Sequence, residues 1–120
     1  MGTWGHEPWD NDLAADWFVD LFEETGLADK VAETLHLDKA EYHQEIRAAA
    51  FVLIQLGHPY IWPVDRLHDD LVTAAERLEA MLNHSQWQTE FGGCPELVNA
   101  VKAELAVLKS RITETGQFRT

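Results

Sequence analysis

Apolar residues recur every three or four positions along most of the chain, which is the spacing of one face of an α-helix. The clearest stretch covers residues 10–24. Its apolar positions are Leu13, Ala14, Trp17, Phe18, Leu21 and Phe22. We expect this face, Trp17 included, to lie in the core. Asn11 or Asp12 is the expected cap at the start of the helix, and Gly26 ends it.

An acidic edge runs along the same stretch. Its carboxylates recur every four residues, at Asp12, Asp16, Asp20 and Glu24. Like charges at this spacing repel, at a cost of about 0.2–0.5 kcal/mol for each pair. The edge therefore has two interpretations. It binds a divalent cation or a basic partner, or it is solvated or neutralised by an arginine of another helix (Arg47, Arg66 or Arg77).

The same spacing predicts four further helices, over about residues 27–37, 38–56, 64–83 and 95–115, with a short turn at 86–91. Asp38 is the expected cap of the 38–56 helix, with Glu41 in the capping-box position. That helix is apolar nearly all round from residue 48 to residue 56, which predicts a central, deeply buried position.

The last predicted helix has a narrow apolar seam, suited to packing along another helix. Its positions are Leu97, Val101, Leu105, Leu108 and Ile112. The neighbouring helix is one of this chain or, as an alternative, belongs to a second copy in a homodimer.

No stretch alternates apolar and polar residues as strands do, and 120 residues are typical of one domain. We therefore predict a single all-α domain, a compact bundle of about five helices. Residues 1–9 form an ordered arm, residues 10–116 the helical body and residues 117–120 a frayed tail. The arm contains Trp4 and Trp9, and we expect at least one of these apolar rings to dock on the body.

The net charge of −12 is unevenly distributed. Residues 1–45 hold 12 Asp and Glu against two Lys. A negative surface repels nucleic acid and anionic membranes, so we expect neither as a partner; it favours a basic protein partner, or serves solubility alone. Cys94 is the single cysteine, and residues 1–8 lack the features of a secretory signal. Both observations fit a cytoplasmic location.

Asp16 is the most informative carboxylate because it lies beside the apolar face, where partial burial requires a hydrogen-bond donor. We expect that donor to be the Trp4 indole, a backbone N–H of the arm, or an arginine. Trp4, Asn11, Asp12 and Asp16 are thus the candidate lock, or binding site, between the arm and the first helix. Asp20 and Glu24 are the carboxylates left to meet a partner.

The connection at residues 57–63 contains two prolines and large aromatic residues. It forms a rigid lid over the core, or a partner-binding surface, since Tyr60 and Trp62 on a stiff loop make good anchors. His58 is its pH-sensitive residue. The sequence identifies no catalytic residue, and we predict no cofactor or metal site. The calcium-loop pattern fails at Ala14 and Ala15, and Glu33-x-x-His36 is half of a di-iron motif.

The arm and first helix resemble a known family. Trp4-Gly5, then Asn11-Asp12, then Ala14-Ala15-Asp16 are similar to the opening motif of the bacterial family called domain of unknown function 4259. The resemblance implies a small, soluble bacterial protein without an assigned activity, and it carries over no catalytic residue.

The leading hypothesis is a non-enzymatic protein that binds a basic protein partner through its acidic N-terminal half. One alternative is an enzyme, acting on a small molecule or using a metal, with a pocket beside the acidic edge. The other is the homodimer. Carboxylates and a histidine around one pocket favour the enzyme, and an acidic surface without a pocket favours the binding protein.

Overall fold

The computed structural model describes residues 6–9, 11–91 and 93–116. It contains six α-helices: α1 (Asp12–Thr25), α2 (Leu27–Leu35), α3 (His43–Leu56), α4 (Val64–Leu82), α5 (Ser85–Phe91) and α6 (Pro95–Gly116). The predicted all-α class is confirmed. Helix α5 is the additional one, because the sequence predicts only a short turn at these residues. Trp4 and the predicted tail at residues 117–120 lie outside the described residues.

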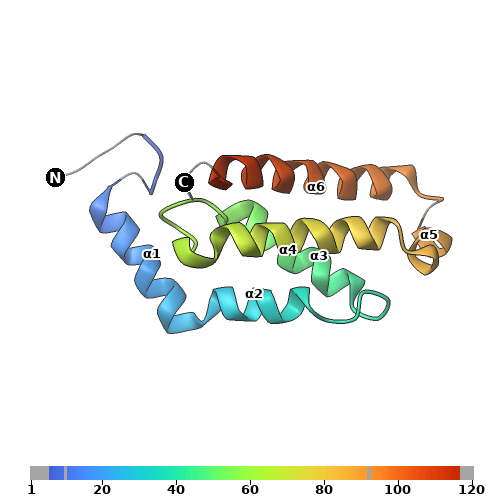
Figure 1. Ribbon diagram of the computed structural model, residues 1–120, viewed down its shortest axis with the longest axis horizontal. Coiled ribbons are helices and arrows are strands. Elements are labelled where there is room, and N and C mark those ends of the chain that lie inside the picture. Colours follow the sequence, from blue (N-terminus) through green and yellow to red (C-terminus); the bar gives the residue numbers. More distant parts are fainter. Residues whose placement is uncertain (1–5, 10, 92, 117–120) are drawn as a thin grey trace.

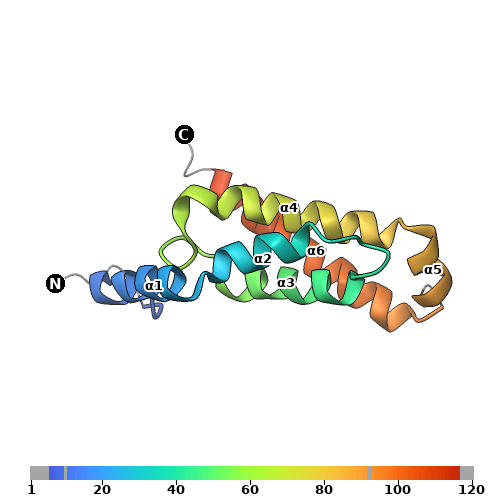
Figure 2. The same ribbon diagram turned by 90° about the horizontal axis from the view of Figure 1, so that it is seen from below.

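Four helices run along the length of an elongated body measuring 54 × 26 × 25 Å (Figures 1 and 2). Helix α4 contacts α2, α3 and α6, and α2 packs on α3. The short α5 lies at one end of the body and α1 at the other, inclined to the remaining helices (Figure 1). This arrangement gives α4 neighbours on several sides and leaves α1 with few.

The core is built from the inner faces of α2, α3, α4 and α6. Its fully buried side chains include Leu35, Ile46, Leu53, Leu71, Leu78, Val101 and Leu108. The expectation that α3 is the most buried helix is wrong, because Ala48 and Phe51 face solvent and seven positions of α4 are buried. Helix α4 takes the central place since α3 is covered on fewer sides.

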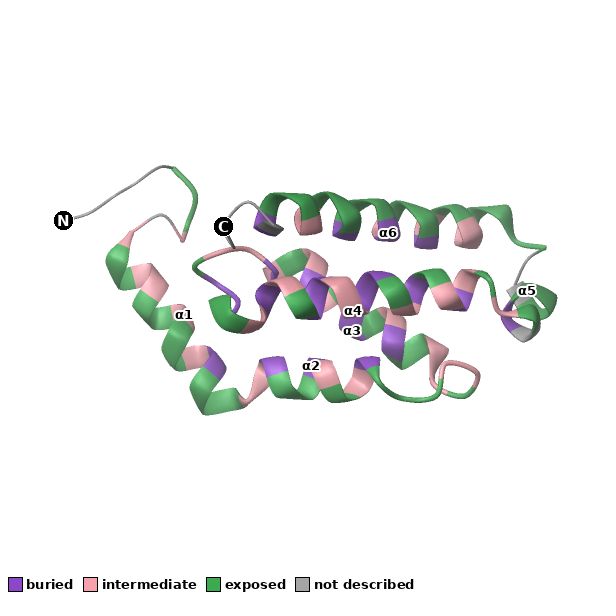
Figure 3. Cartoon of the chain, viewed as in Figure 1, coloured by how far each residue is buried: buried purple, intermediate pink, exposed green. Residues whose placement is uncertain are grey.

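The seam of α6 is used within the chain. Val101, Leu105 and Leu108 are buried, and Leu97 and Ile112 are half-buried against the core. In the view coloured by burial, the buried part of α6 lies on the side that faces α4 (Figure 3). The predicted packing along another helix is therefore met by α4. A homodimer built on this seam would have to separate the two helices.

Helix α1 departs most from expectation. Phe22 is its one buried residue, and Phe18 and Leu21 are half-buried. By contrast Leu13 is 78% exposed, Trp17 60% and Val19 53%. The prediction that Trp17 belongs to the core is wrong because α1 lies at the end of the bundle, where α2 covers only part of its apolar surface (Figure 3).

The predicted caps at both ends of α1 are confirmed, whereas the predicted cap at the start of α3 is not. Asn11 caps α1, its side-chain oxygen accepting from the Ala14 N–H at 2.9 Å, and Gly26 ends the helix with φ 63°. The predicted cap of α3 is wrong. Asp38 accepts from the Ala40 N–H and forms a turn instead, so that α3 begins only at His43.

Candidate binding groove and acidic helix face

A groove of about 700 Å³ separates α1 from the start of α4. Its walls come from α1, from Ala28 and Asp29 of α2, from the connection at residues 59–63 and from the first residues of α4, and Thr115 of α6 also lines it. We call it the α1–α4 groove. It lies beside the helix that carries the acidic edge, on the side of α1 that holds Ala15, Val19, Phe22 and Glu23.

The groove has an apolar floor and a partly charged rim. Phe22, Ile61 and Trp62 are buried side chains at its base. The Phe22 and Trp62 rings meet edge to face, with centroids 5.0 Å apart. Glu23, Asp29 and Asp65 supply carboxylates around this floor. The lining thus combines apolar contact with negative charge.

Tyr60 stands over the groove in an unusual backbone conformation. Its φ is 74°, the one positive value among the described non-glycine residues, and its side chain is 52% exposed. A bulky residue rarely adopts this conformation, which costs about 1–3 kcal/mol and recurs at functional loops. The strain indicates that the connection is held in place by its surroundings.

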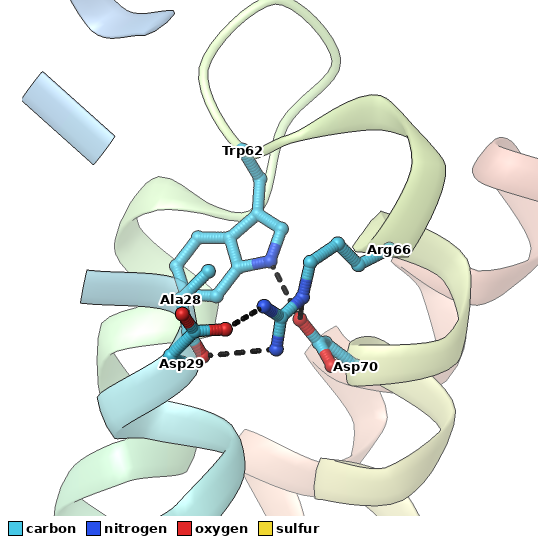
Figure 4. Close-up of polar contacts among 5 residues, drawn as sticks. All are labelled: Ala28, Asp29, Trp62, Arg66 and Asp70. Atoms are coloured by element: carbon cyan, nitrogen blue, oxygen red, sulfur yellow. Dashed lines mark hydrogen bonds and ion pairs between the residues drawn. The ribbon is translucent and has the colours of Figure 1, made fainter. Parts of the chain in front are cut away.

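Those surroundings include a hydrogen-bonded network at the corner of α4 (Figure 4). The Trp62 indole Nε1 donates to Asp70 Oδ2 at 2.9 Å, and Arg66 Nε donates to the same oxygen at 3.2 Å. Arg66 also contacts the Asp29 carboxylate and donates to the Ala28 carbonyl of α2. The network ties the connection, α4 and α2 together.

Burial makes Asp70 the residue on which this network depends. It is 8% exposed, so both of its donors are needed to offset the loss of water around the carboxylate. The hydrogen bond to Asp29 raises the pKa of the Arg66 guanidinium, and the charge of Asp70 adds to the effect. Since Asp29 is itself exposed, its ion pair contributes less to stability than Asp70 does.

Asp70 was missed from the sequence, although a signal was present. It follows Leu67 by three residues and precedes Ala74 by four, so it occupies the apolar face of α4. A carboxylate on such a face requires a donor. Arg66 stands four residues earlier, which is the spacing at which two side chains of one helix meet.

The arm docks on the body through Trp9. Its ring stacks on the His58 imidazole with centroids 4.7 Å apart and an angle of 21° between planes. The expectation that an arm tryptophan packs on the body is therefore confirmed. Burial lowers the pKa of His58 below its ordinary value of 6.5; Arg111 lowers it further, while Glu114 and Glu7 oppose the shift.

A histidine also lines the groove. His68 Nδ1 lies 3.1 Å from the hydroxyl oxygen of Thr115, which is itself buried and 3.1 Å from the Ile112 carbonyl oxygen. A hydroxyl has one proton to donate. When that proton goes to the carbonyl, Nδ1 of His68 is the donor to Thr115, and Nε2 is the ring nitrogen left for other partners.

The opposite side of α1 carries a different surface. Leu13, Trp17, Asp20 and Glu24 follow one another at steps of four, three and four residues, so they share one line along the helix. All four are exposed. We call this line, with the flanking Asp16, the outer face of α1. It presents two large apolar side chains beside three carboxylates.

We next locate the residues of the predicted lock between the arm and the first helix. Asn11 is the cap of α1, Asp12 and Asp16 are exposed, and Trp4 lies outside the described residues. The three arginines considered as partners of the acidic edge bind elsewhere within the described part of the chain. Arg47 pairs with Glu104, Arg66 with Asp29 and Asp70, and Arg77 donates to the Leu37 carbonyl.

The predicted partner surface divides into two. Asp20 and Glu24 lie on the outer face of α1, whereas Tyr60 lines the groove on the other side of that helix. Trp62 is 1% exposed and belongs to the core, because its indole bonds to Asp70 beneath the connection. The rigid-lid interpretation thus fits Trp62, and the surface interpretation remains open for Tyr60.

The described residues contain no group of three or more His, Cys, Asp and Glu side chains placed to hold a metal ion. None of their helices combines the length and apolar character needed to cross a membrane. What the two surfaces offer is apolar contact together with negative charge.

The family model described as domain of unknown function (DUF4259) matches residues 2–115. The chain therefore belongs to this family. It matches no curated protein and no solved structure.

Proposed function

We propose that this member of the DUF4259 family is a non-enzymatic protein that binds a basic protein partner through the outer face of α1. The observation that carries the proposal is the exposure of Trp17 at 60% and Leu13 at 78%, in line with Asp20 and Glu24. Exposed tryptophan is enriched where proteins meet, because a large rigid ring buries much area at low entropic cost.

The chemistry of the face describes the partner. Trp17 and Leu13 need an apolar recess to leave water, and Asp16, Asp20 and Glu24 need positive charge around it. The edge-to-face contact between Trp17 and Phe18, with centroids 5.3 Å apart, holds the indole in one orientation before binding. Charge attraction speeds the encounter, and the apolar anchors set the affinity.

Capture from the host's own lysate tests this function. The wild-type chain is the bait at low and then high salt, beside Leu13→Ser/Trp17→Ser and Asp20→Asn/Glu24→Gln baits. We expect the wild type to capture a basic protein that high salt releases, and both variants to lose it. Phe51→Ser, which changes an exposed ring on α3, is the matched control and retains capture. Equal capture by all four baits would exclude the outer face.

A second candidate function is favoured by one observation. His68, oriented by Thr115, and the carboxylates of Glu23, Asp29 and Asp65 line a single groove. A histidine and carboxylates in one pocket are the material of a small-molecule enzyme. The first candidate is preferred because an enzyme with its site in the groove would leave the exposed Trp17 and Leu13 of the outer face unexplained.

The remaining parts of the proposal rest on the sequence. A bacterial, cytoplasmic protein accords with the opening motif and the single cysteine, Cys94.

A homodimer would need a surface other than the α6 seam. The outer face of α1 is a poor candidate for self-association, because two copies would bring like charges together.

A further inference from the structure

We propose that the α1–α4 groove is a second binding site, for a small primary amine carried on an apolar body such as an aryl-ethyl group. This site lies on the other side of α1 from the outer face, so it goes beyond the proposed function and does not depend on it. The inference rests on the size, the charge and the acceptor chemistry of the groove.

The size and walls of the groove fit an apolar small molecule. Its volume of about 700 Å³ lies in the range of small-molecule pockets, roughly 300–1,000 Å³. Phe22 and Trp62 form a buried apolar base, and Val19 and Val64 are exposed at 53% and 76% on its walls. An apolar ligand would remove both valines from water.

The charge of the lining selects a cation. Glu23, Asp29 and Asp65 line the groove, and among its described lining residues Arg66 is the single Lys or Arg. The Arg66 guanidinium is already engaged by Asp29, Asp70 and the Ala28 carbonyl. A bound ammonium would therefore meet net negative charge, and the exposed ring of Tyr60 adds the attraction of an aromatic face for cations.

The acceptor chemistry selects a primary amine over a quaternary one. Nδ1 of His68 is directed to the Thr115 hydroxyl, which itself donates to the Ile112 carbonyl, so Nε2 is the ring nitrogen left for a ligand. The carboxylates of Asp65 and Glu23 are acceptors. A primary ammonium has three N–H donors to offer them, whereas a quaternary ammonium has none.

Other occupants fit less well. A second copy of the chain would bring another acidic N-terminal half, with 12 Asp and Glu against two Lys, to an acidic rim. An anionic ligand meets the same repulsion. A lysine side chain of a polypeptide shares the ammonium but lacks the apolar body that the floor accommodates, and the test below separates it from a free amine.

Nuclear magnetic resonance titration of the full chain tests the proposal with phenethylamine, 2-phenylethanol and phenylacetate, which share one ring. We expect phenethylamine to shift the Trp62 indole N–H resonance and to bind more tightly than the alcohol, and about tenfold more tightly than the acid. Acid binding as tight as amine binding would overturn the proposal. So would binding of Nα-acetyl-lysine amide as tight as that of phenethylamine.

Two variants with matched controls locate the site. Asp65→Asn should weaken phenethylamine binding about threefold without changing alcohol binding, whereas Glu76→Gln, elsewhere on α4, should change neither. Val19→Trp should fill the groove and abolish binding of all probes, and Val107→Trp on α6 should leave it intact. Unchanged binding in Val19→Trp would contradict the assignment.

The two proposals fail separately. Leu13→Ser/Trp17→Ser alters the outer face alone, so this variant should bind phenethylamine like the wild type. A loss of amine binding there would show that the two surfaces are not independent sites and would overturn the groove assignment.

Discussion

Two regions of this molecule combine a tryptophan with carboxylates on helical spacing, and they use the combination in opposite ways. At the corner of α4, Trp62 is 1% exposed and its indole donates to the buried Asp70. On the outer face of α1, Trp17 is 60% exposed and Asp20 and Glu24 lie in solvent. The first arrangement is complete within the chain, and the second leaves its groups exposed to solvent.

The difference follows from the number of helices around each region. Helix α4 has neighbours on several sides, so a polar side chain on its inner face must find its partners inside the protein. Among the helices, α1 packs mainly on α2, and its outer face remains in water. The contrast teaches that the same types of side chain form internal hydrogen bonds where burial is deep and stay exposed where it is shallow.

The largest effect should come from breaking the α4 corner. Asp70→Ala leaves the Trp62 indole N–H buried without an acceptor and removes one ion pair of Arg66. We expect the free energy of unfolding to fall by about 3 kcal/mol. Urea denaturation followed by circular dichroism measures it. Glu76→Ala, an exposed acid on the same helix, should change stability by less than about 0.5 kcal/mol. Equal losses would show that Asp70 has no special role.

A smaller loss should follow when only the indole donor is removed. Trp62→Phe keeps an aromatic ring in the core but leaves Asp70 with the donors of Arg66 alone. We expect a loss of about 1–2 kcal/mol, part of it from the smaller ring. The double variant Trp62→Phe/Asp70→Ala should lose less stability than the sum of the losses in the two single variants. Strict additivity would mean that the indole and the carboxylate do not interact.

A third effect concerns the arm. The pKa of His58 is lower in the folded chain than its ordinary 6.5, so the unfolded chain binds more protons near that pH. Its contribution to stability is therefore present above 6.5 and lost as the pH falls toward the folded pKa. His58→Gln should flatten this part of the curve of unfolding free energy against pH. His36→Gln, an exposed histidine, should not. A steeper curve for His58→Gln would contradict the sign.

Much of the fold was predictable because the spacing of apolar residues in a helix and the glycine that ends it are set by neighbouring residues in the sequence. The spacing of α4 and α6 and the ends of α1 at Asn11 and Gly26 were read from neighbouring residues. The position of α1 relative to the bundle was not, since an apolar face shows that a helix has something to bury but not how much its neighbours cover. Trp17 was therefore assigned to the core.

The same limit applies to the candidate sites. The acidic edge was visible in the sequence. Which residues of α1 face the groove depends on how the helix is oriented about its own axis, and the sequence does not give that orientation. Asp70 was hidden because the donors that satisfy it come from Trp62 and Arg66, and their meeting depends on how the connection folds back over α4. The groove was foreseen only as a pocket beside the acidic edge.

The smallest effect on stability should come from the outer face of α1. Trp17→Ser removes a ring that is mostly in water, so the free energy of unfolding should change by less than about 0.5 kcal/mol. Phe22→Ser, five residues along the same helix, removes a buried ring and should cost about 3 kcal/mol or more. Thermal and urea unfolding of the two variants compare the inner and outer faces of one helix. A large loss for Trp17→Ser would mean that this indole supports the fold, and its exposure could then no longer be taken as evidence for a partner.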